Sequence, residues 1–168
     1  ITPITSSIAE EHILRTSELP NNTKISLQII IDNYIPQLTT QRDERCDKCG
    51  EVYEVINTLI SPTPIIIIHV NKATNNNNKT ETEIQTNDEI KIQTTENPMG
   101  ELYKVTDVII HHGTQATEGH YVTTHYKEDQ ERWEKVDDEN IVQISSKDAD
   151  DLNKHGVIYV LRRSATYK

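Results

Sequence analysis

The sequence predicts an α+β domain that is mostly antiparallel β-sheet with a few short helices. Isoleucine- and valine-rich runs recur at strand-like spacing, although only 34% of the 168 residues are apolar and the mean hydropathy is -0.66. Short turn-forming segments separate these runs, and Ser26 and Ser145 or Ser146 can each start a short helix. Because β-branched residues favour strands and a chain of this length can bury one core, we predict a single domain.

The first elements are an extended segment and a helix. Residues 8–16 mix apolar and charged side chains and stop at the turn signal Leu19–Asn22. Ser26 can cap a helix that begins at Leu27, and Pro36 prevents that helix from continuing far.

The next segments are predicted to be strands on either side of two prolines. Residues 51–60 alternate well enough for a half-buried strand. The unbroken run Ile65–Val70 suits a strand buried on both faces, so we place it at the centre of the sheet. Residues 71–80 are polar and are expected to form a flexible loop tip.

The second half of the chain predicts an antiparallel meander. Its long strand covers residues 101–112, with Tyr103, Val105, Asp107 and Ile109 on one face. The remaining predicted elements are short strands near 83–86 and 89–93, strands 120–126 and 131–136, a helix from Ser145 or Ser146 through Leu152, and a last strand 156–162.

The net charge of -10 argues against binding to nucleic acid or to an anionic membrane, because both need basic patches. A partner with a basic segment fits better, although an acidic surface can also serve solubility alone. No stretch approaches the roughly 20 apolar residues that span a bilayer. The chain begins without Met in a segment of strand and turn character, so we expect the natural polypeptide to extend upstream.

A histidine and a carboxylate pair are expected on neighbouring strands. The stretch Gly119–His125 is followed by Trp133–Asp138, which brings His120 within reach of Asp137 or Asp138. A carboxylate holds a catalytic imidazole in one tautomer and stabilises its protonated form. Asp137 and Asp138 would face opposite sides of a strand, so only one is expected to be the partner. The alternative is a structural histidine beside a turn-forming acidic pair.

Cys46 and Cys49, followed by Gly50, have the spacing of half a tetrahedral zinc site. The chain has no other cysteine, so further ligands would lie upstream of Ile1, and a metal-free knuckle remains the alternative. A disulfide across so short a loop would be strained, and no helix follows that would lower a thiol pKa.

A second conceivable metal centre consists of His111, His112, His120 and His125. Adjacent strand residues point to opposite faces, as do residues five apart, so at most two of these side chains are expected to converge. Such a centre needs three or four ligands, and the spacing therefore argues against it.

The order of these elements resembles the C-terminal portion of the ubiquitin-specific protease family of deubiquitinating enzymes. It comprises the Cys-x-x-Cys knuckle, the strand ending at His69, the strand 103–112, Gly119-His120-Tyr121, the run to Asp137-Asp138 and a last strand with Tyr159. The resemblance is strongest from Tyr103 to Leu161. It implies part of a papain-like thiol hydrolase fold, with fingers at about residues 1–60 and palm at about 61–168, and without the N-terminal box that carries the nucleophilic Cys.

The resemblance also implies roles for individual residues. His120 matches the general base, Asp137 the orienting acid and Asp138 a neighbour that assists. Cys46 and Cys49 match the second half of a zinc ribbon, whose first half is missing. We expect Gly119 and Tyr121, with the loop 113–118, to line the channel for the substrate's tail. The sequence departs from the family pattern at residues 71–73, which lack a basic–aromatic pair, and at Val136, where an aromatic is usual.

The function implied is that of a cysteine-type deubiquitinase acting on ubiquitin or ubiquitinated proteins, with its nucleophile upstream. The alternative is a non-catalytic ubiquitin-binding or scaffold domain, and a generic α+β protein is a third possibility. The expected chemistry needs no cofactor, zinc would be structural, and the expected location is cytoplasmic or nuclear. We expect the isolated chain to hydrolyse nothing, and we expect neither nucleic acid nor membrane as a partner.

Overall fold

The computed structural model describes residues 23–38, 41–56, 63–74, 78–94 and 96–164. The expected extended segment and turn before residue 23 lie outside this part of the chain. The elements are β1 (Lys24–Ser26), α1 (Leu27–Leu38), β2 (Gln41–Arg45), β3 (Val52–Ile56), β4 (Ile65–His69), β5 (Glu83–Gln85), β6 (Ile90–Ile92), β7 (Glu101–His112), β8 (His120–Lys127), β9 (Arg132–Asp137), β10 (Asn140–Ile144), α2 (Ser146–Asn153) and β11 (Gly156–Arg163).

Both predicted helices form, and the serine that precedes the first helical residue caps each one. The Ser26 hydroxyl accepts a hydrogen bond from the Gln28 amide at 3.2 Å, and the Ser145 hydroxyl accepts one from the Asp148 amide at 3.1 Å. These bonds satisfy amides that have no partner in the first helical turn. Helix α1 ends at Leu38, two residues after Pro36, as the sequence predicts.

A seven-stranded sheet is the largest element of the described fold. Its order is β10-β9-β8-β7-β11-β4, and β6 pairs with one end of β7. All of its pairings are antiparallel, and the predicted meander is the run β7, β8, β9, which β10 extends by one strand that was not predicted. The two-stranded pairs β1-β5 and β2-β3 complete the described strands.

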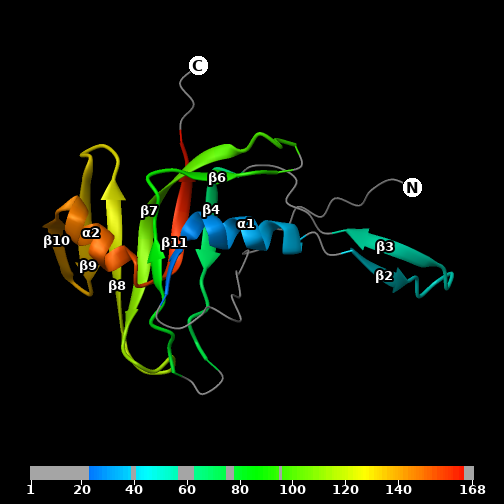
Figure 1. Ribbon diagram of the computed structural model, residues 1–168, viewed down its shortest axis with the longest axis horizontal. Coiled ribbons are helices and arrows are strands. Elements are labelled where there is room, and N and C mark those ends of the chain that lie inside the picture. Colours follow the sequence, from blue (N-terminus) through cyan, green and yellow to red (C-terminus); the bar gives the residue numbers. More distant parts are fainter. Residues whose placement is uncertain (1–22, 39–40, 57–62, 75–77, 95, 165–168) are drawn as a thin grey trace.

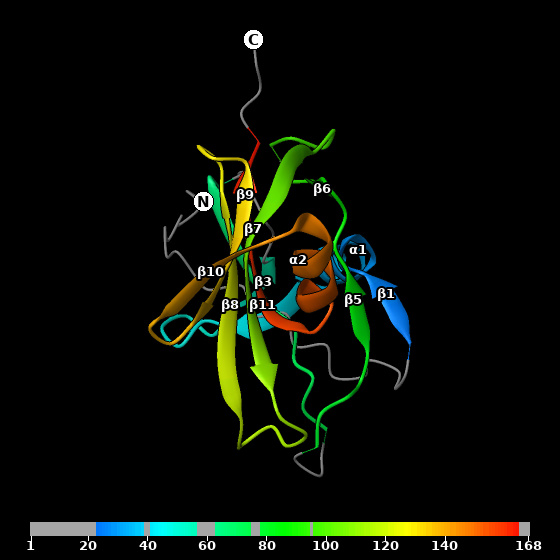
Figure 2. The same cartoon turned by 90° about the vertical axis from the view of Figure 1, so that its left-hand side faces the viewer.

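The core lies on one side of this sheet. Figure 2 shows α1, α2, β1 and β5 on the same side. Leu27, Ile31 and Ile84 from that layer join side chains of the sheet in one buried cluster. The sheet's members of the cluster are Ile68, Ile90, Ile92, Tyr103, Val105, Val108, Ile110, Val122, Tyr159 and Leu161.

The prediction for residues 65–70 was wrong in its position. Strand β4 forms, but it pairs only with β11 and is the outermost described strand on that side of the sheet. Ile68 is buried, whereas Ile65 and Ile67 are 47% and 45% exposed. An unbroken β-branched run therefore marks a strand here without marking the centre of the sheet.

The predicted face of the long strand was also wrong over half its length. Val105 pairs with Leu161 and Asp107 with Val160, so Thr106 is an extra residue, a β-bulge. The bulge reverses the alternation: Tyr103 and Val105 face the core, whereas Asp107 lies on the opposite side of the sheet. One inserted residue thus turns the Asp107 carboxylate away from the core.

The two cysteines lie on a hairpin that extends away from the sheet (Figure 1). Strands β2 and β3 pair from Gln41↔Ile56 to Arg45↔Val52, and residues 46–51 form the turn. Strand β3 corresponds to the expected strand 51–60, of which residues 57–60 lie outside the described part of the chain. Within the described residues, neither helix has the length and apolar character needed to cross a membrane.

Candidate active site

His120 and Asp137 meet at the end of the β8-β9 pair. His120 is the first residue of β8 and Asp137 is the last of β9. The register Thr123↔Val136 makes them diagonal neighbours on one face. The His120 Nε2 atom lies 2.6 Å from Asp137 Oδ1, at hydrogen-bonding distance. The strand spacing predicted Asp137 or Asp138 as the partner of His120, and the family resemblance implied Asp137, the residue in contact here.

The second oxygen of Asp137 binds a lysine. Lys135 Nζ lies 2.7 Å from Asp137 Oδ2, and residues two apart in a strand share a face. The hydrogen bond from Lys135, followed by that with His120, lowers the pKa of Asp137 to about 2. The carboxylate is therefore ionised at all ordinary pH values, and both of its oxygens are engaged.

The contact with Asp137 decides which ring nitrogen of His120 can react. The hydrogen bond to Asp137 raises the pKa of His120 above its usual value, and the charges of Asp138 and Asp137 act in the same direction. Because Nε2 faces the carboxylate, Nδ1 is left to exchange a proton with another group. The side chain is 49% exposed, so such a group can reach it.

Asp138 lies beyond the strand rather than on its opposite face. It begins the turn between β9 and β10 with a positive φ of 51°. A ring nitrogen of His120 and one carboxylate oxygen each from Asp137 and Asp138 all lie within 4.8 Å of one another. The expectation that the two carboxylates diverge was wrong because the strand ends at Asp137. The positive charge of Lys135, bound to Asp137, would repel a metal cation bound by these three residues. The three side chains therefore suit proton transfer better than metal binding.

Gly119 leaves no room for a side chain. A Cβ at this position would lie 2.1 Å from the His112 carbonyl oxygen and 2.2 Å from His111 Nε2. Tyr121 is 58% exposed, and its ring centroid is 4.6 Å from that of His111. The buried His111 imidazole thus supports both residues that were expected to line the substrate channel.

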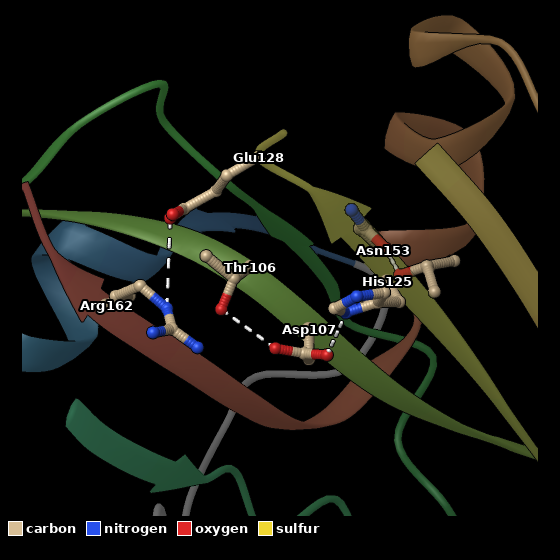
Figure 3. Close-up of polar contacts among 7 residues, drawn as sticks. Thr106, Asp107, His125, Glu128, Asn153 and Arg162 are labelled. Carbon is tan, nitrogen blue, oxygen red and sulfur yellow. Dashed lines mark hydrogen bonds and ion pairs between the residues drawn. The ribbon is translucent and has the colours of Figure 1, made fainter. Parts of the chain in front are cut away.

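A second histidine–carboxylate pair lies further along β8 and was missed at the sequence level. His125 Nδ1 is 2.6 Å from Asp107 Oδ1, and the Thr106 hydroxyl donates to Asp107 Oδ2 at 2.8 Å. Figure 3 shows the Asp107 carboxylate between the two. Strand alternation places this pair on the face opposite to His120. Residue spacing alone does not predict this pair, because it depends on the register of β7 against β8.

The four histidines do not gather into a metal centre. Among the described residues, the converging group of three or more ligand side chains contains His120 but none of the other three. His111 is buried against Tyr121, and His125 lies on the opposite face from His120. The sequence argument against this centre is consistent with that arrangement.

Cys46 and Cys49 fit half of a zinc site. The turn is closed by bonds from the Gly50 amide to the Cys46 carbonyl and from the Cys46 amide to the Glu51 carbonyl, each 2.8 Å. Both thiols are free. The backbone amides of Cys49 and Lys48, followed by the Cys49 thiol, lower the pKa of Cys46. This favours the thiolate form that binds zinc, but a tetrahedral site needs two further ligands.

Comparisons with known proteins agree with this architecture. The sequence model of the family described as "Ubiquitin carboxyl-terminal hydrolase" matches residues 10–161. "Ubiquitin carboxyl-terminal hydrolase 3" of Saccharomyces cerevisiae is 39% identical over 46 residues, which is 27% of this chain and 5% of that protein.

Two solved structures are similar in fold. One is the SAGA DUB module with Ubp8, Sgf11, Sus1 and Sgf73 bound to monoubiquitin, with a TM-score of 0.57 and 14% identity over 86% of this chain and 36% of that chain. The other is the SAGA DUB module of the same four proteins, with a TM-score of 0.59 and 14% identity over 92% of this chain and 33% of that chain. The chain therefore spans about a third of the length of these structures.

Proposed function

Because this chain belongs to the ubiquitin carboxyl-terminal hydrolase family, we propose that it is the histidine- and aspartate-bearing part of a cysteine-type deubiquitinase. The observation that carries the proposal is the 2.6 Å contact between His120 Nε2 and Asp137 Oδ1, which holds the imidazole with Nδ1 free. Its fold, an antiparallel sheet with two helices, is the fold of the similar deubiquitinase structures.

The proposed reaction is acyl transfer through a thioester. His120 Nδ1 takes the proton of a cysteine thiol, and the sulfur attacks the carbonyl carbon of the substrate's terminal glycine. The imidazolium then protonates the leaving amine as the C–N bond breaks. His120 next deprotonates a water molecule, whose oxygen attacks the thioester and releases the thiolate and the glycine carboxylate. Asp137 stabilises the imidazolium in both steps.

The nucleophile is proposed to come from outside this chain. Its two cysteines lie in the turn of the β2-β3 hairpin, which points away from β8 and β9 in Figure 1. Neither thiol begins a helix that would stabilise a thiolate for attack. In the family's terms, the hairpin would belong to the fingers, about residues 1–60, and the large sheet to the palm, about residues 61–168.

The substrate proposed is ubiquitin, bound through a basic tail that ends in glycine. An acidic chain suits such a tail. Gly119 and Tyr121 are proposed to contact it, Gly119 because it has no side chain and Tyr121 because its exposed ring rests on His111. Asp138, beside His120, is proposed to assist by holding the imidazole or water in place.

Replacement of Tyr121 tests the proposed channel better than replacement of Gly119, where any Cβ also disturbs the fold. Tyr121→Ala is expected to raise KM for a ubiquitin C-terminal amide about tenfold, the loss typical of an aromatic contact residue. Ile141→Ala is the matched control, because Ile141 is 62% exposed on the same sheet and is expected to leave KM unchanged. Equal KM values for Tyr121→Ala and wild type would remove Tyr121 from the channel.

The proposed function is tested by two preparations, the complete polypeptide and this chain alone. The complete polypeptide is expected to release a fluorescent amine from the C terminus of ubiquitin, and the chain alone is expected to release none. Turnover by the chain alone would show that the nucleophile lies within it.

A non-catalytic ubiquitin-binding or scaffold domain is the second candidate, because no nucleophile is found beside His120 in the described residues. A complete polypeptide that binds ubiquitin without turning over any ubiquitin ester or amide would favour this candidate.

A further inference from the structure

Two loops that are distant in sequence meet beside the start of β8. The segment after β4 folds back on itself, with the Thr74 amide bound to the Asn78 carbonyl at 2.8 Å. It then joins the loop between β7 and β8, where Asn78 bridges to Gln115 and the Lys79 amide binds the Thr114 carbonyl at 3.1 Å. The expected loop tip at residues 71–80 is therefore tied to the loop that leads into Gly119 and His120.

The side chain of Lys79 adds the strongest link between these loops. Its ammonium donates to the carbonyl of Gly113 at 2.9 Å and to the carbonyl of His111. Among the described residues, no carboxylate forms an ion pair with Lys79. Burial lowers the pKa of Lys79, because it disfavours the charged form. Bonds from a charged donor are about twice as strong as neutral ones.

The two ends of the loop held by Lys79 lie against each other. Gly113 has a φ of 137°, and a Cβ there would lie 2.7 Å from the Glu118 carbonyl oxygen, so the two ends of the loop are in contact. At its end, Gly119 lies against the His111 ring, whose own carbonyl is bound by Lys79. Next to it, His120 pairs directly with His112. A displaced His111 carbonyl would therefore move the ring that supports Gly119 and Tyr121.

We propose that Lys79 is a positioning residue that fixes the 113–119 loop, and with it Gly119 and Tyr121, at the entrance to the tail channel. The inference rests on the proposed function, since it assigns Lys79 to the binding of the same substrate tail. His120 itself stays in place through Asp137 and the β7-β8-β9 ladder. Loss of Lys79 is therefore expected to raise KM more than it lowers kcat.

The test replaces Lys79 in the complete polypeptide and measures kcat and KM separately for a ubiquitin C-terminal amide. Lys79→Met is expected to raise KM about tenfold and to change kcat less than about twofold. Lys79→Arg, which keeps a charged donor, is expected to restore most of the affinity. Lys104→Met, at an exposed lysine on β7, is the matched control and is expected to match wild type. A Lys79→Met enzyme with wild-type KM would overturn the proposal, as would an equal rise in KM for Lys104→Met.

Amide hydrogen exchange on the chain tests the same anchor without any turnover. Lys79→Met is expected to speed exchange at the amides of residues 114–121 while leaving the amides of β9 unchanged. If wild type shows no turnover but this exchange pattern appears, the deubiquitinase proposal fails and the loop anchor stands. Unchanged exchange in the loop overturns the anchor whatever the activity. Lys79→Gln provides the same comparison if the methionine variant does not fold.

Discussion

The His120 imidazole is held through Nε2, and Nδ1 is the atom that we propose to react. Asp137 is fixed in turn by Lys135 at 2.7 Å, so its carboxylate cannot turn away from the ring without losing an ion pair. This Lys135–Asp137–His120 series was only partly predicted. The spacing of the two strands predicted Asp137 or Asp138 as the acid, and the family resemblance implied Asp137. Lys135 was missed, although residues two apart in a strand share a face.

Removal of the Asp137 charge is expected to lower the pKa of His120. The hydrogen bond to Asp137 is the main cause of its raised pKa, so Asp137→Asn is expected to return it toward the ordinary value of about 6.5. An NMR titration of the His120 ring protons measures this. Asp107→Asn, which changes the other pair, is the control and is expected to leave the His120 titration as it is. An unchanged pKa in Asp137→Asn would show that Asp137 does not hold the imidazole in solution.

The same shift gives stability a definite pH dependence. Because the folded state raises the pKa of His120, its imidazolium contributes stability that is fully present below the unfolded-state pKa. This contribution is lost as the pH rises through the raised, folded-state pKa. The difference in urea midpoint between wild type and His120→Gln is therefore expected to shrink from about pH 5 to about pH 9. A difference that is constant with pH would contradict this linkage.

At the scale of elements, helix caps decide where a helix starts, and strand bulges decide which side chains of a strand face the core. The helix start at Ser145 and the strands of the meander were predictable from caps and alternation, because these signals are local. The bulge at Thr106 was not predictable, since it follows from the pairing of β7 with β11. Strand β10 was missed because its short sequence is mostly exposed, and β2 because five polar or charged residues form it through pairing with β3.

The cap of α2 offers a direct test of local stability. Ser145→Ala removes the hydroxyl that accepts the Asp148 amide and is expected to cost about 1 kcal/mol of unfolding free energy. Ser146→Ala, one residue later and already inside the helix, is the control and is expected to leave the free energy of unfolding unchanged or to raise it by roughly a few tenths of a kcal/mol, because alanine has the higher helix propensity. Denaturant unfolding of the two variants measures the difference. Equal losses would mean that the cap does not form.

The cysteine turn leads to a prediction about zinc. We propose that Cys46 and Cys49 supply two ligands of a structural zinc site completed by residues outside the described part. Metal analysis of the complete polypeptide is expected to find zinc in wild type and in His120→Asn, but not in Cys46→Ser or Cys49→Ser. Zinc content that survives either serine substitution would place the metal elsewhere, and a metal-free wild type would favour a bare knuckle.

At the scale of the whole molecule, the sheet separates a covered face from an open one. The two helices and the core cover one side (Figure 2). The strand registers place Ile65, Ile67, Tyr121 and Ile141 on the other side, and these residues are about half exposed or more. The order of strands shows that the run Ile65–His69 is the outermost described strand on its side of the sheet, a position that the sequence pattern did not predict. Local patterns predict elements and their faces, but the place of a strand in a sheet depends on pairings that are distant in sequence.

In the candidate site, contacts between segments close in sequence were predictable, whereas contacts between distant segments were not. The contact of His120 with Asp137 joins two strands linked by a short turn, so spacing predicted that His120 would meet one of the two neighbouring acids, and the family resemblance implied Asp137. The pair His125–Asp107 and the bonds from Lys79 to His111 and Gly113 join segments whose register had to be seen. Asp138 was placed wrongly because the end of β9 depends on its pairing with β10.

The central claim is that His120, and not the similar His125 pair on the opposite face, is the base of a deubiquitinase. The most direct measurement compares turnover of a ubiquitin C-terminal amide by His120→Asn and His125→Asn variants of the complete polypeptide. Loss of a general base is expected to lower kcat at least about a hundredfold in His120→Asn, while His125→Asn stays near wild type. Equal activity of the two variants, or a loss confined to His125→Asn, would contradict the assignment.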